Sequence, residues 1–458
     1  MDSIDGFVLG ERLHAGAMGA VYEVTSGAPF PAVMKLPHVG RGDSLESLLA
    51  FEVESMLLPA LHGSHLPRFV AAGGIAQRPY LVLERIEGES LQHRMDRGRI
   101  APSEAVAIGA AIADALDELH LQDAIHLDLK PDNVLLRSDG AAVLIDFGLS
   151  HHARFPDLLA EENRLAAGSA PYVSPEQVRG VRSDPRSDLF SLGVVLYEML
   201  AGRLPFGIPQ SVAGLRDRLW REPPPPSVVA PEVEPWLQEV VLRCLEVDAE
   251  ARYQSAAHLA FDLRNPAQVR LTGRARRTRT AGIARQLHRW WRAGRATSAR
   301  LKSPAAQANS APVILAAVDT MHPEDKRQPA IRQAISQVLR LSRDFRLICL
   351  SVVPGGPGGE HDALEHFARL RQWVEPFKLN DERLSLHVVQ SASPAQSIVE
   401  FAQRNRSALI VLGAPQQGAQ ALGWWRSVAS TVTAQAPCSV HVVRLPDDAG
   451  GERRLPQP

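Results

Sequence analysis

Two segments near the middle of the N-terminal half carry residues that could move a phosphoryl group. Residues 126–133 read His-Leu-Asp-Leu-Lys-Pro-Asp-Asn, and residues 145–148 read Ile-Asp-Phe-Gly. Phosphoryl transfer needs a carboxylate that receives a hydroxyl proton, oxygen ligands for magnesium, a cation on the phosphate oxygens and a lid over the phosphates. The two segments offer carboxylate, amide and ammonium groups for such a site.

A lid and a second cation are found upstream. The stretch LHAGAMGAV, from Leu13 to Val21, lies between two predicted strands, and glycines there would let backbone N–H groups approach a phosphate. By itself, a plain hairpin with two glycines explains it equally well. Lys35 ends the stretch AVMK, and Glu54 lies in the next predicted helix, placed to pair with it. A surface lysine on an edge strand is the alternative, but the spacing between the glycines and the helix favours a functional lysine.

Taken together, these stretches resemble the protein kinase family over residues 7 to about 264, and in particular the bacterial Hanks-type Ser/Thr kinases. Residues 168–177, GSAPYVSPEQ, resemble the end of a kinase activation segment. The resemblance implies a bilobal α+β protein kinase fold, a non-specific Ser/Thr protein kinase activity, ATP with Mg²⁺ or Mn²⁺, and protein substrates. Ordinary turn carboxylates remain the alternative for the aspartates, but the two motifs rarely coincide at this spacing.

The resemblance also implies roles for individual residues. Asp128 would be the base that orients the substrate hydroxyl, Lys130 would steady the transferred phosphoryl group, and Lys35 with Glu54 would hold the α- and β-phosphates. The implied metal ligands are Asn133 and Asp146. The implied ATP contacts are Leu13, Gly16, Gly19, Val21, Val33, Lys35, Glu84, Ile86 and Leu135. The implied structural or regulatory residues are His126, Phe147, Ser169, Glu176, Asp188 and Arg252, with Arg252 as the partner of Glu176.

The sequence departs from the family pattern at two positions that matter. His14 stands where the first glycine of the lid is expected. Leu127 replaces the arginine that, in most such kinases, binds a phosphorylated residue of the activation loop. Residues 151–168 contain no Ser, Thr or Tyr that could be phosphorylated. We therefore hypothesise that activation-loop phosphorylation does not control this protein.

The elements that must position these residues follow from periodicity. Residues 7 to about 85 alternate as short strands around one helical run, Ser44–Leu61, which predicts a small sheet lobe. Residues 86–264 become helical, with an amphipathic run at Pro102–His120 and an almost wholly apolar run at Asp188–Ala201. The catalytic segments would then lie between a sheet lobe and a helical lobe, within a domain of residues 1–264.

Residues 265–311 are expected to form a basic linker. Between Asp262 and Asp319 lie twelve of the 50 Lys and Arg residues and no acidic residue, with two adjacent tryptophans at Trp290 and Trp291. Such a composition suits anionic lipid or nucleic-acid phosphates. A solvated tether that folds back on the acidic remainder of the chain is the interpretation we favour. A helical turn is predicted around Ile283–Trp291, and residues 446–458 are expected to be a flexible tail.

Residues 312–445 alternate strand and helix, which predicts a parallel sheet wrapped by helices. They resemble the universal stress protein family, through VILAAVD at 313–319, LIVLG at 409–413 and APCSVHVV at 436–443. The resemblance implies a Rossmann-like α/β domain with a five-stranded parallel sheet, and a second nucleotide site at Asp319, Gly413 and Ser427. Gln416 and Arg426 replace two glycines of the phosphate loop, so a docking or dimerising module, pairing through residues 439–444, is preferred to nucleotide sensing.

Composition limits the remaining alternatives. A chain of 458 residues with a net charge of −1 and 45% hydrophobic residues suits a folded protein of two or three domains. No long apolar run and three scattered cysteines point to the cytoplasm. Besides an active kinase that could form a homodimer, two other functions stay open: a pseudokinase scaffold, and a nucleotide or stress-signal sensor without phosphoryl transfer.

Overall fold

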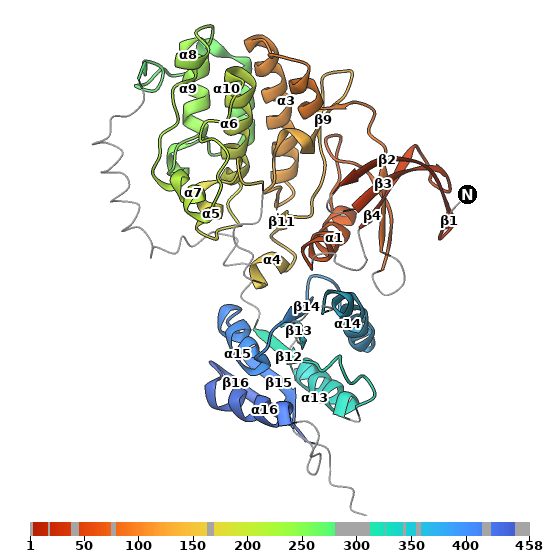
Figure 1. Cartoon of the computed structure of the whole chain (residues 1–458). Coiled ribbons are helices and arrows are strands. Elements are labelled where there is room, and N and C mark those ends of the chain that lie inside the picture. Colours follow the sequence, from red (N-terminus) through yellow and green to blue (C-terminus); the bar gives the residue numbers. More distant parts are fainter. Residues whose placement is uncertain are drawn as a thin grey trace, which may run out of the picture. The chain divides into compact units, whose positions relative to one another are not determined.

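The computed structural model describes residues 3–16, 19–37, 45–74, 79–162, 169–279, 312–325, 327–341, 345–353, 359–414 and 423–444. Nearly all described residues up to 279 form one compact unit, and those from 312 on form a second. Figure 1 shows both units. In the described part of the chain, no helix is both long enough and apolar enough to cross a membrane.

The first unit begins with a six-stranded antiparallel sheet in the order β1-β2-β3-β4-β6-β5. Its strands are β1 (Ser3–Ile4), β2 (Phe7–Gly16), β3 (Gly19–Ser26), β4 (Ala32–Pro37), β5 (Phe69–Gly73) and β6 (Tyr80–Glu84). One face buries a small core that includes Val24, Met34 and Val82. The predicted helix 44–61 is α1 (Leu45–Leu57) followed by the 3₁₀ turn η1 (Leu58–Ala60), since Pro59 cannot donate the next helical hydrogen bond.

A helical lobe follows, in which α3, α6, α9 and α10 pack together (Figure 1). The helices are α2 (Leu91–Asp96), α3 (Pro102–His120), α4 (Leu158–Glu161), α5 (Pro175–Val178), α6 (Arg186–Ala201), α7 (Val212–Arg216), α8 (Pro226–Val229), α9 (Pro235–Cys244) and α10 (Ala256–Arg264). The 3₁₀ turns are η2 (Pro131–Asn133), η3 (Asp217–Leu219), η4 (Ala249–Ala251) and η5 (Pro266–Gln268). Helix α6 is buried on nearly all sides, as its apolar sequence predicts.

Short strand pairs hold the two chemically active segments. Strands β9 (Val134–Leu136) and β10 (Ala142–Leu144) form a hairpin, with β7 (Glu89–Ser90) beside β9. The first segment therefore ends where β9 begins, and the second starts where β10 ends. A further pair joins β8 (Ala124–Ile125), just before the first segment, to β11 (His151–His152), just after the second. These pairs bring residues 126–133 and 145–148 side by side.

Residues 265–279, which composition assigns to the linker, pack on the helical lobe. Glu239 of α9 is 2% exposed and accepts hydrogen bonds from the Thr272 N–H (2.9 Å), the Thr272 hydroxyl (2.8 Å) and the Ala275 N–H (3.0 Å). Arg274 adds ion pairs to Glu239 and to Glu246. We call residues 271–279 the basic strap. The strap folds back on carboxylates of the first unit, while the predicted turn at 283–291 lies outside the described residues.

The second unit contains a parallel sheet in the order β14-β13-β12-β15-β16, as predicted. Its strands are β12 (Val313–Ala317), β13 (Arg346–Val353), β14 (Leu384–Gln390), β15 (Leu409–Gly413) and β16 (Ser439–Val443). Its helices are α13 (Arg327–Leu341), α14 (Gly359–Val374), α15 (Pro394–Arg404) and α16 (Gly423–Gln435), with the 3₁₀ turn η6 (Glu375–Phe377). Apolar residues of β12, β13, β15, α15 and α16 form one core.

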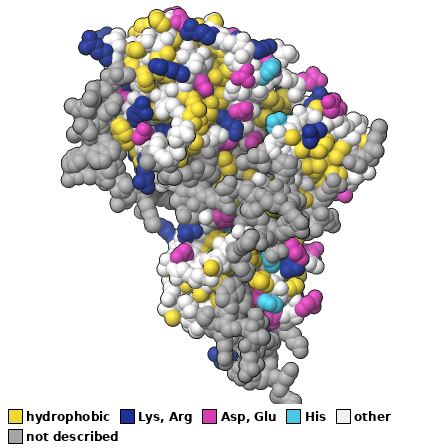
Figure 2. All heavy atoms as spheres, viewed as in Figure 1, with side chains coloured by type: hydrophobic (Ala, Val, Ile, Leu, Met, Phe, Trp, Pro, Cys, Tyr) yellow, Lys and Arg dark blue, Asp and Glu magenta, His cyan; other side chains and the backbone are white. Residues whose placement is uncertain are grey.

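The surface of the first unit mixes charges of both signs. On the face shown in Figure 2, Lys and Arg side chains are interspersed with Asp and Glu side chains. Charged side chains of this unit form close ion pairs, such as Arg94 with Glu104 and Arg99 with Glu232. Surface pairs of this kind contribute little to stability, so the stability of this unit depends on its core and its buried pairs.

Candidate active site

One face of the N-terminal sheet presents the predicted phosphate lysine. In the antiparallel register of β3 and β4, Val21 lies directly opposite Lys35, so the two side chains point to the same face. Val33 precedes Lys35 by two residues and shares that face, because side chains alternate along a strand. The neighbouring residues Ala32 and Met34 point the other way, into the core. The sheet therefore offers a cation flanked by two half-buried valines.

Lys35 is held by two carboxylates from distant parts of the chain. Its Nζ lies 2.6 Å from Glu54 Oε2 of α1 and 3.0 Å from Asp146 Oδ1. Burial by itself would lower the pKa of Lys35, but the two carboxylates outweigh it and raise that pKa above its ordinary value. The Lys35 ammonium in turn overcomes burial at Asp146 and lowers the pKa of that carboxyl. Lys35 is thus a fixed cation beside an ionised carboxylate.

The glycine hairpin lies beside this face. Gly16 pairs with Gly19, and residues 17 and 18 lie outside the described part. At Gly19, with φ of 153°, an added Cβ would lie 2.3 Å from the carbonyl oxygen of Leu36, so only glycine fits. The imidazole of His14 lies against Gly16. Leu13 is 43% exposed, which leaves an apolar side chain uncovered next to the hairpin.

The segment that links the two lobes contains the predicted adenine contacts. The Glu84 N–H donates to the Arg68 carbonyl, and the Arg85 N–H donates to the Pro31 carbonyl. Within the described part of the chain, the N–H of Ile86 makes no hydrogen bond. Leu135 of β9 is half-buried, like Val21 and Val33. A donor that protein groups leave unused, with apolar side chains that are not fully covered, suits a flat heteroaromatic ligand.

Asp128 is the centre of the second part of the site. Its Oδ1 accepts a hydrogen bond from the Ser169 N–H at 2.6 Å, and its Oδ2 lies 3.1 Å from both Lys130 Nζ and Asn133 Nδ2. The contact to Ser169 runs through the main chain of that residue. Three donors therefore fix the Asp128 carboxylate in one orientation, close to an ammonium group.

The two predicted metal ligands also lie close to Asp128. The Asn133 amide donates to Asp128, which leaves the Asn133 amide oxygen to serve as a ligand. The Ile145 N–H donates to the Asn133 carbonyl, so Asp146 follows directly beside it. A carboxylate and an amide oxygen are the hard ligands that Mg²⁺ and Mn²⁺ prefer, with phosphate oxygens completing the shell. The donor set fits such an ion.

His126 and Phe147 connect the two segments. His126 accepts from the Asp128 N–H through Nδ1 and contacts the Ile145 carbonyl through Nε2, which fits the tautomer with its proton on Nε2. Its ring centroid lies 5.1 Å from that of Phe147. The Phe147 N–H donates to Glu54 Oε1 at 3.0 Å, while Glu54 Oε2 holds Lys35. One carboxylate of α1 therefore contacts both Lys35 of the sheet and the main chain of the second segment.

Asp188 of α6 binds the main chain at the start of the first segment, residues 126–133. Its carboxylate accepts from the N–H groups of His126 (2.9 Å) and Leu127 (2.8 Å) and lies 2.9 Å from His120 Nε2. Burial opposes ionisation, but these contacts outweigh it and hold the pKa of Asp188 below its ordinary value. Leu127 is 2% exposed and has φ of 61°, a strained conformation for a branched residue. The Asp188 contact and a bond from Gln177 to the Leu127 carbonyl maintain it.

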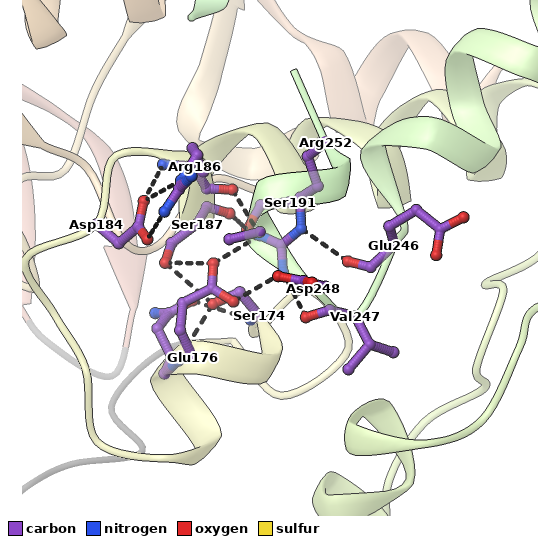
Figure 3. A network of polar contacts seen from close by, with 12 residues as sticks. Ser174, Glu176, Asp184, Arg186, Ser187, Ser191, Glu246, Val247, Asp248 and Arg252 are labelled. Carbon is purple, nitrogen blue, oxygen red and sulfur yellow. Dashed lines mark hydrogen bonds and ion pairs between the residues drawn. The ribbon is translucent and has the colours of Figure 1, made fainter. Parts of the chain in front are cut away.

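A buried arginine fastens the end of the activation segment (Figure 3). Arg252 donates to both carboxylate oxygens of Glu176, at 2.6 and 2.8 Å, and to the carbonyls of Arg186, Glu246 and Val247. The Ser187 hydroxyl donates to Glu176 as well. Both charged groups are buried, and each is satisfied by several partners. The predicted pair of Glu176 and Arg252 is thus present in the structure.

Three further contacts near the site were not predicted from the sequence. Gln177 is the last residue of a capping box begun by Ser174, a pattern that the sequence S-P-E-Q shows. His120, which contacts Asp188, ends the predicted helix 102–120 and carries no other signal. Arg182 donates twice to Asp157, at 2.9 and 3.0 Å, and also to the Leu149 carbonyl. This last pair joins both ends of the activation segment, and no motif marks it.

In the second unit, Asp319 of the predicted nucleotide site lines a cavity together with Arg332 and Arg369, but its carboxylate is already bound by protein groups. Asp319 Oδ1 accepts from the N–H groups of Met321 and His322, and its Oδ2 lies 2.9 Å from His322 Nδ1. At the end of β15, Arg327 lies against Gly413 and donates to the Ala414 carbonyl at 2.8 Å. Residues 415–422, which contain Gln416, lie outside the described part, as does the side chain of Ser427. Both described residues of this predicted site are engaged by protein groups.

Comparison with known proteins fits this geometry. A sequence profile of the protein kinase domain matches residues 7–262, and a profile of the universal stress protein family matches residues 312–444. Curated relatives include a probable serine/threonine-protein kinase of Streptomyces coelicolor, 36% identical over 186 residues, and serine/threonine-protein kinase Pkn1 of Myxococcus xanthus, 35% identical over 291 residues. These alignments cover 40% and 61% of this chain, and 28% and 40% of the two relatives.

Among solved structures, the kinase domain of Mycobacterium tuberculosis PknI, as its C20A mutant, is 25% identical. That match covers 58% of this chain and 97% of that domain, with a TM-score of 0.45. The profile match to residues 7–262 spans more than half of the chain and contains every kinase-like motif described above. The chain belongs to the protein kinase family and carries a C-terminal domain of the universal stress protein family.

Proposed function

We propose that the protein is a Ser/Thr protein kinase that transfers the γ-phosphoryl group of ATP, with Mg²⁺, to protein hydroxyls. The observation that carries this proposal is the network around Lys35 and Asp128. Lys35 contacts Glu54 and Asp146 at the same time, and Asp128 is oriented by Ser169, Lys130 and Asn133. These are the parts that phosphoryl transfer requires, assembled in one region.

Each of these groups has a chemical task in that reaction. The metal would neutralise charge on the phosphate oxygens, with Asn133 and Asp146 as its protein ligands. Lys35, kept protonated by its two carboxylates, can bind the α- and β-phosphates. Asp128 can accept a hydrogen bond from the substrate hydroxyl and later its proton, because the carboxylate is fixed and lies beside the Lys130 ammonium. Lys130 can also neutralise charge on the phosphoryl group in transfer.

A pseudokinase scaffold is the second candidate. His14 in the glycine hairpin and Leu127 in the catalytic loop favour it, because both depart from the family pattern. Against it stands the complete set of catalytic side chains, which the structure joins by hydrogen bonds rather than leaving scattered. A chain that only bound a partner would have no need of a fixed carboxylate at Asp128.

The test is transfer of radiolabelled phosphate from ATP to a generic basic protein by the full chain. We expect the wild type to label the substrate, and Asp128→Asn to label it at least about a hundredfold more slowly, because a positioned general base contributes about 10²–10⁴-fold. Nucleotide binding by this variant should persist. Equal labelling by both proteins, or none by either, contradicts the kinase assignment and favours a scaffold.

We further propose that activation-loop phosphorylation does not control the kinase. Leu127 supplies no cation for a phosphate, and residues 151–168 supply no hydroxyl. The pair of Arg182 and Asp157 joins the segment after β11 to the segment after α5 without a phosphate. Phosphatase treatment should therefore leave the rate of transfer unchanged. A rate that falls on treatment and returns with a phosphate between residues 146 and 176 refutes this proposal.

For the second unit, we propose a docking or dimerising role. The support is that Asp319 and the end of β15 are occupied by protein contacts, whereas β16 is an edge strand of the sheet with alternating exposure. An edge strand offers unpaired backbone groups to a second strand. Light scattering on the full chain and on Val442→Lys tests it. We expect the wild type to be dimeric and the variant monomeric, and a monomeric wild type contradicts dimerisation.

A further inference from the structure

Arg218 is a buried cation that has no carboxylate partner among the described residues. It lies in η3 and is 1% exposed. Its Nη2 donates to the carbonyl oxygens of Ala170 (2.7 Å) and Pro171 (2.9 Å), and its guanidinium carbon lies 5.6 Å from the ring centroid of Phe206. Its Nε is buried and meets no acceptor within the described residues, where no carboxylate lies at ion-pair distance either. In the described part of the chain, two carbonyls and an aromatic ring hold the guanidinium.

Such a group is costly to stability. The adjacent Asp217 is paired with Arg221 instead, at 3.6 Å, and burial lowers the pKa of Arg218 to about 10 against the small opposing effect of Asp217. Removing a charge from water without pairing it to an opposite charge opposes folding. Arg252 shows the contrast, since both oxygens of Glu176 neutralise it. An apolar side chain at position 218 would serve the fold better.

Arg218 holds the short turn at residues 169–172, next to Asp128. The Tyr172 N–H donates to the Ser169 carbonyl at 2.8 Å, and the Ser191 hydroxyl donates to the Tyr172 carbonyl at 2.9 Å. Arg218 supplies the donors for the two carbonyls between them. The Ser169 N–H then contacts Asp128 Oδ1 at 2.6 Å. Arg218 therefore fixes the two peptide groups that directly follow the contact to the proposed base.

We propose that Arg218 is a positioning residue for the protein substrate, an inference that rests on the proposed kinase function. By fixing residues 169–172, it sets the main chain against which the acceptor segment must lie for its hydroxyl to reach Asp128. A planar guanidinium can donate to two neighbouring carbonyls in fixed directions, whereas the single ammonium of lysine cannot hold both in the same way. The destabilising charge is kept because it orders this turn.

The test compares Arg218→Met with the wild-type full chain, using a peptide substrate and ATP. We expect kcat/KM for the peptide to fall at least about tenfold, since small misplacements at a reacting centre have large effects on rate. The KM for ATP should stay unchanged, because Arg218 contacts no group of the predicted ATP site. The melting temperature should stay the same or rise, because an unpaired buried charge has been removed. Arg218→Lys should recover only part of the rate.

Arg252→Met is the matched control, because it removes a buried guanidinium that is fully paired. That variant should lose melting temperature and activity together. If Arg218→Met loses both in the same proportion, or if its peptide kinetics match those of the wild type, the positioning role is wrong. A wild type that transfers no phosphate refutes the kinase assignment itself, and this positioning role with it.

Discussion

The cleft of the kinase unit and the strand ends of the C-terminal unit use the same kinds of group in opposite ways. Both contain an aspartate that follows a β-strand and a glycine that ends or begins one. In the cleft, Asp146 and Lys35 contact each other while Asn133 keeps an amide oxygen for a ligand. In the C-terminal unit, Asp319 caps its own loop and Arg327 covers Gly413. A motif indicates a ligand site only where the fold leaves its atoms unused.

The comparison predicts that carboxylates of the cleft, such as Asp146, mainly affect the rate of phosphate transfer. Carboxylates engaged by protein groups, such as Asp319, should mainly affect stability. The largest effect is expected for Asp146→Asn. It should slow phosphate transfer by at least about 10²-fold, because a group that stabilises transition-state charge is lost. The melting temperature should hold, since Lys35 keeps Glu54 and asparagine tolerates the φ of 67° at this position. A variant that is unfolded or fully active breaks the comparison.

Glu239 is a buried carboxylate of the kinase unit that, like Asp319, is engaged by protein groups. Its contacts to Thr272, Arg274 and Ala275 are all internal, and several of them outweigh burial and lower its pKa. Glu239→Ala should lower the melting temperature by roughly 6–12 °C, for about 3 kcal/mol lost with a buried pair. Glu232→Ala, which removes an exposed pair on the same lobe, is the control and should change little. Equal melting of both variants would show that the strap does not stabilise this unit.

A smaller effect is expected at Asp319. Asp319→Ala removes three acceptor contacts within one loop and should destabilise the C-terminal unit by about 1–2 kcal/mol. Calorimetry should still find one ATP per full chain, with unchanged affinity, because the kinase cleft is intact. A wild type that binds two ATP molecules, and a variant that binds one, would instead assign a nucleotide site to the C-terminal unit.

The smallest effect is expected at His151, in the dependence of stability on pH. Burial, together with Arg182, lowers the pKa of His151 below its ordinary value of about 6.5, although Asp157 opposes this shift. The unfolded chain then binds the proton more readily, so stability is full above about pH 6.5 and falls as the pH drops below it. His151→Gln should remove this loss, at most about 1 kcal/mol, when melting is compared at pH 7.5 and pH 5.5. A wild type with no greater acid sensitivity than the variant contradicts this expectation.

Much of this architecture could be predicted from the sequence, because local patterns and global fold agree. The helix at 102–120 and the five parallel strands of the C-terminal unit lie where periodicity puts them. Lys35 and Asp146 meet although 111 positions separate them in the sequence, and only the family resemblance suggested that both belong to one site. Spacing alone does not give such a contact.

Other features could not be predicted because their signal lies in tertiary packing. The strap has the composition of a linker, and contacts from Gln238, Glu239 and Glu246 make residues 271–279 part of the folded unit. Arg218 stands in a polar stretch where an arginine would be expected to face solvent. The charge of such a residue says nothing of its burial until the fold is known, so both the strap and Arg218 require the structure.

Glu54 of α1 connects two separate parts of the kinase cleft. One of its carboxylate oxygens holds Lys35 of the sheet, and the other holds the main chain of Phe147. If α1 turned or shifted by more than a hydrogen bond tolerates, both bonds would break together, and neither could be kept without the other. The position of α1 therefore decides whether the phosphate lysine and the metal loop are coupled. With α1 in place, Glu54 holds both, and with α1 displaced, both lose this contact at once.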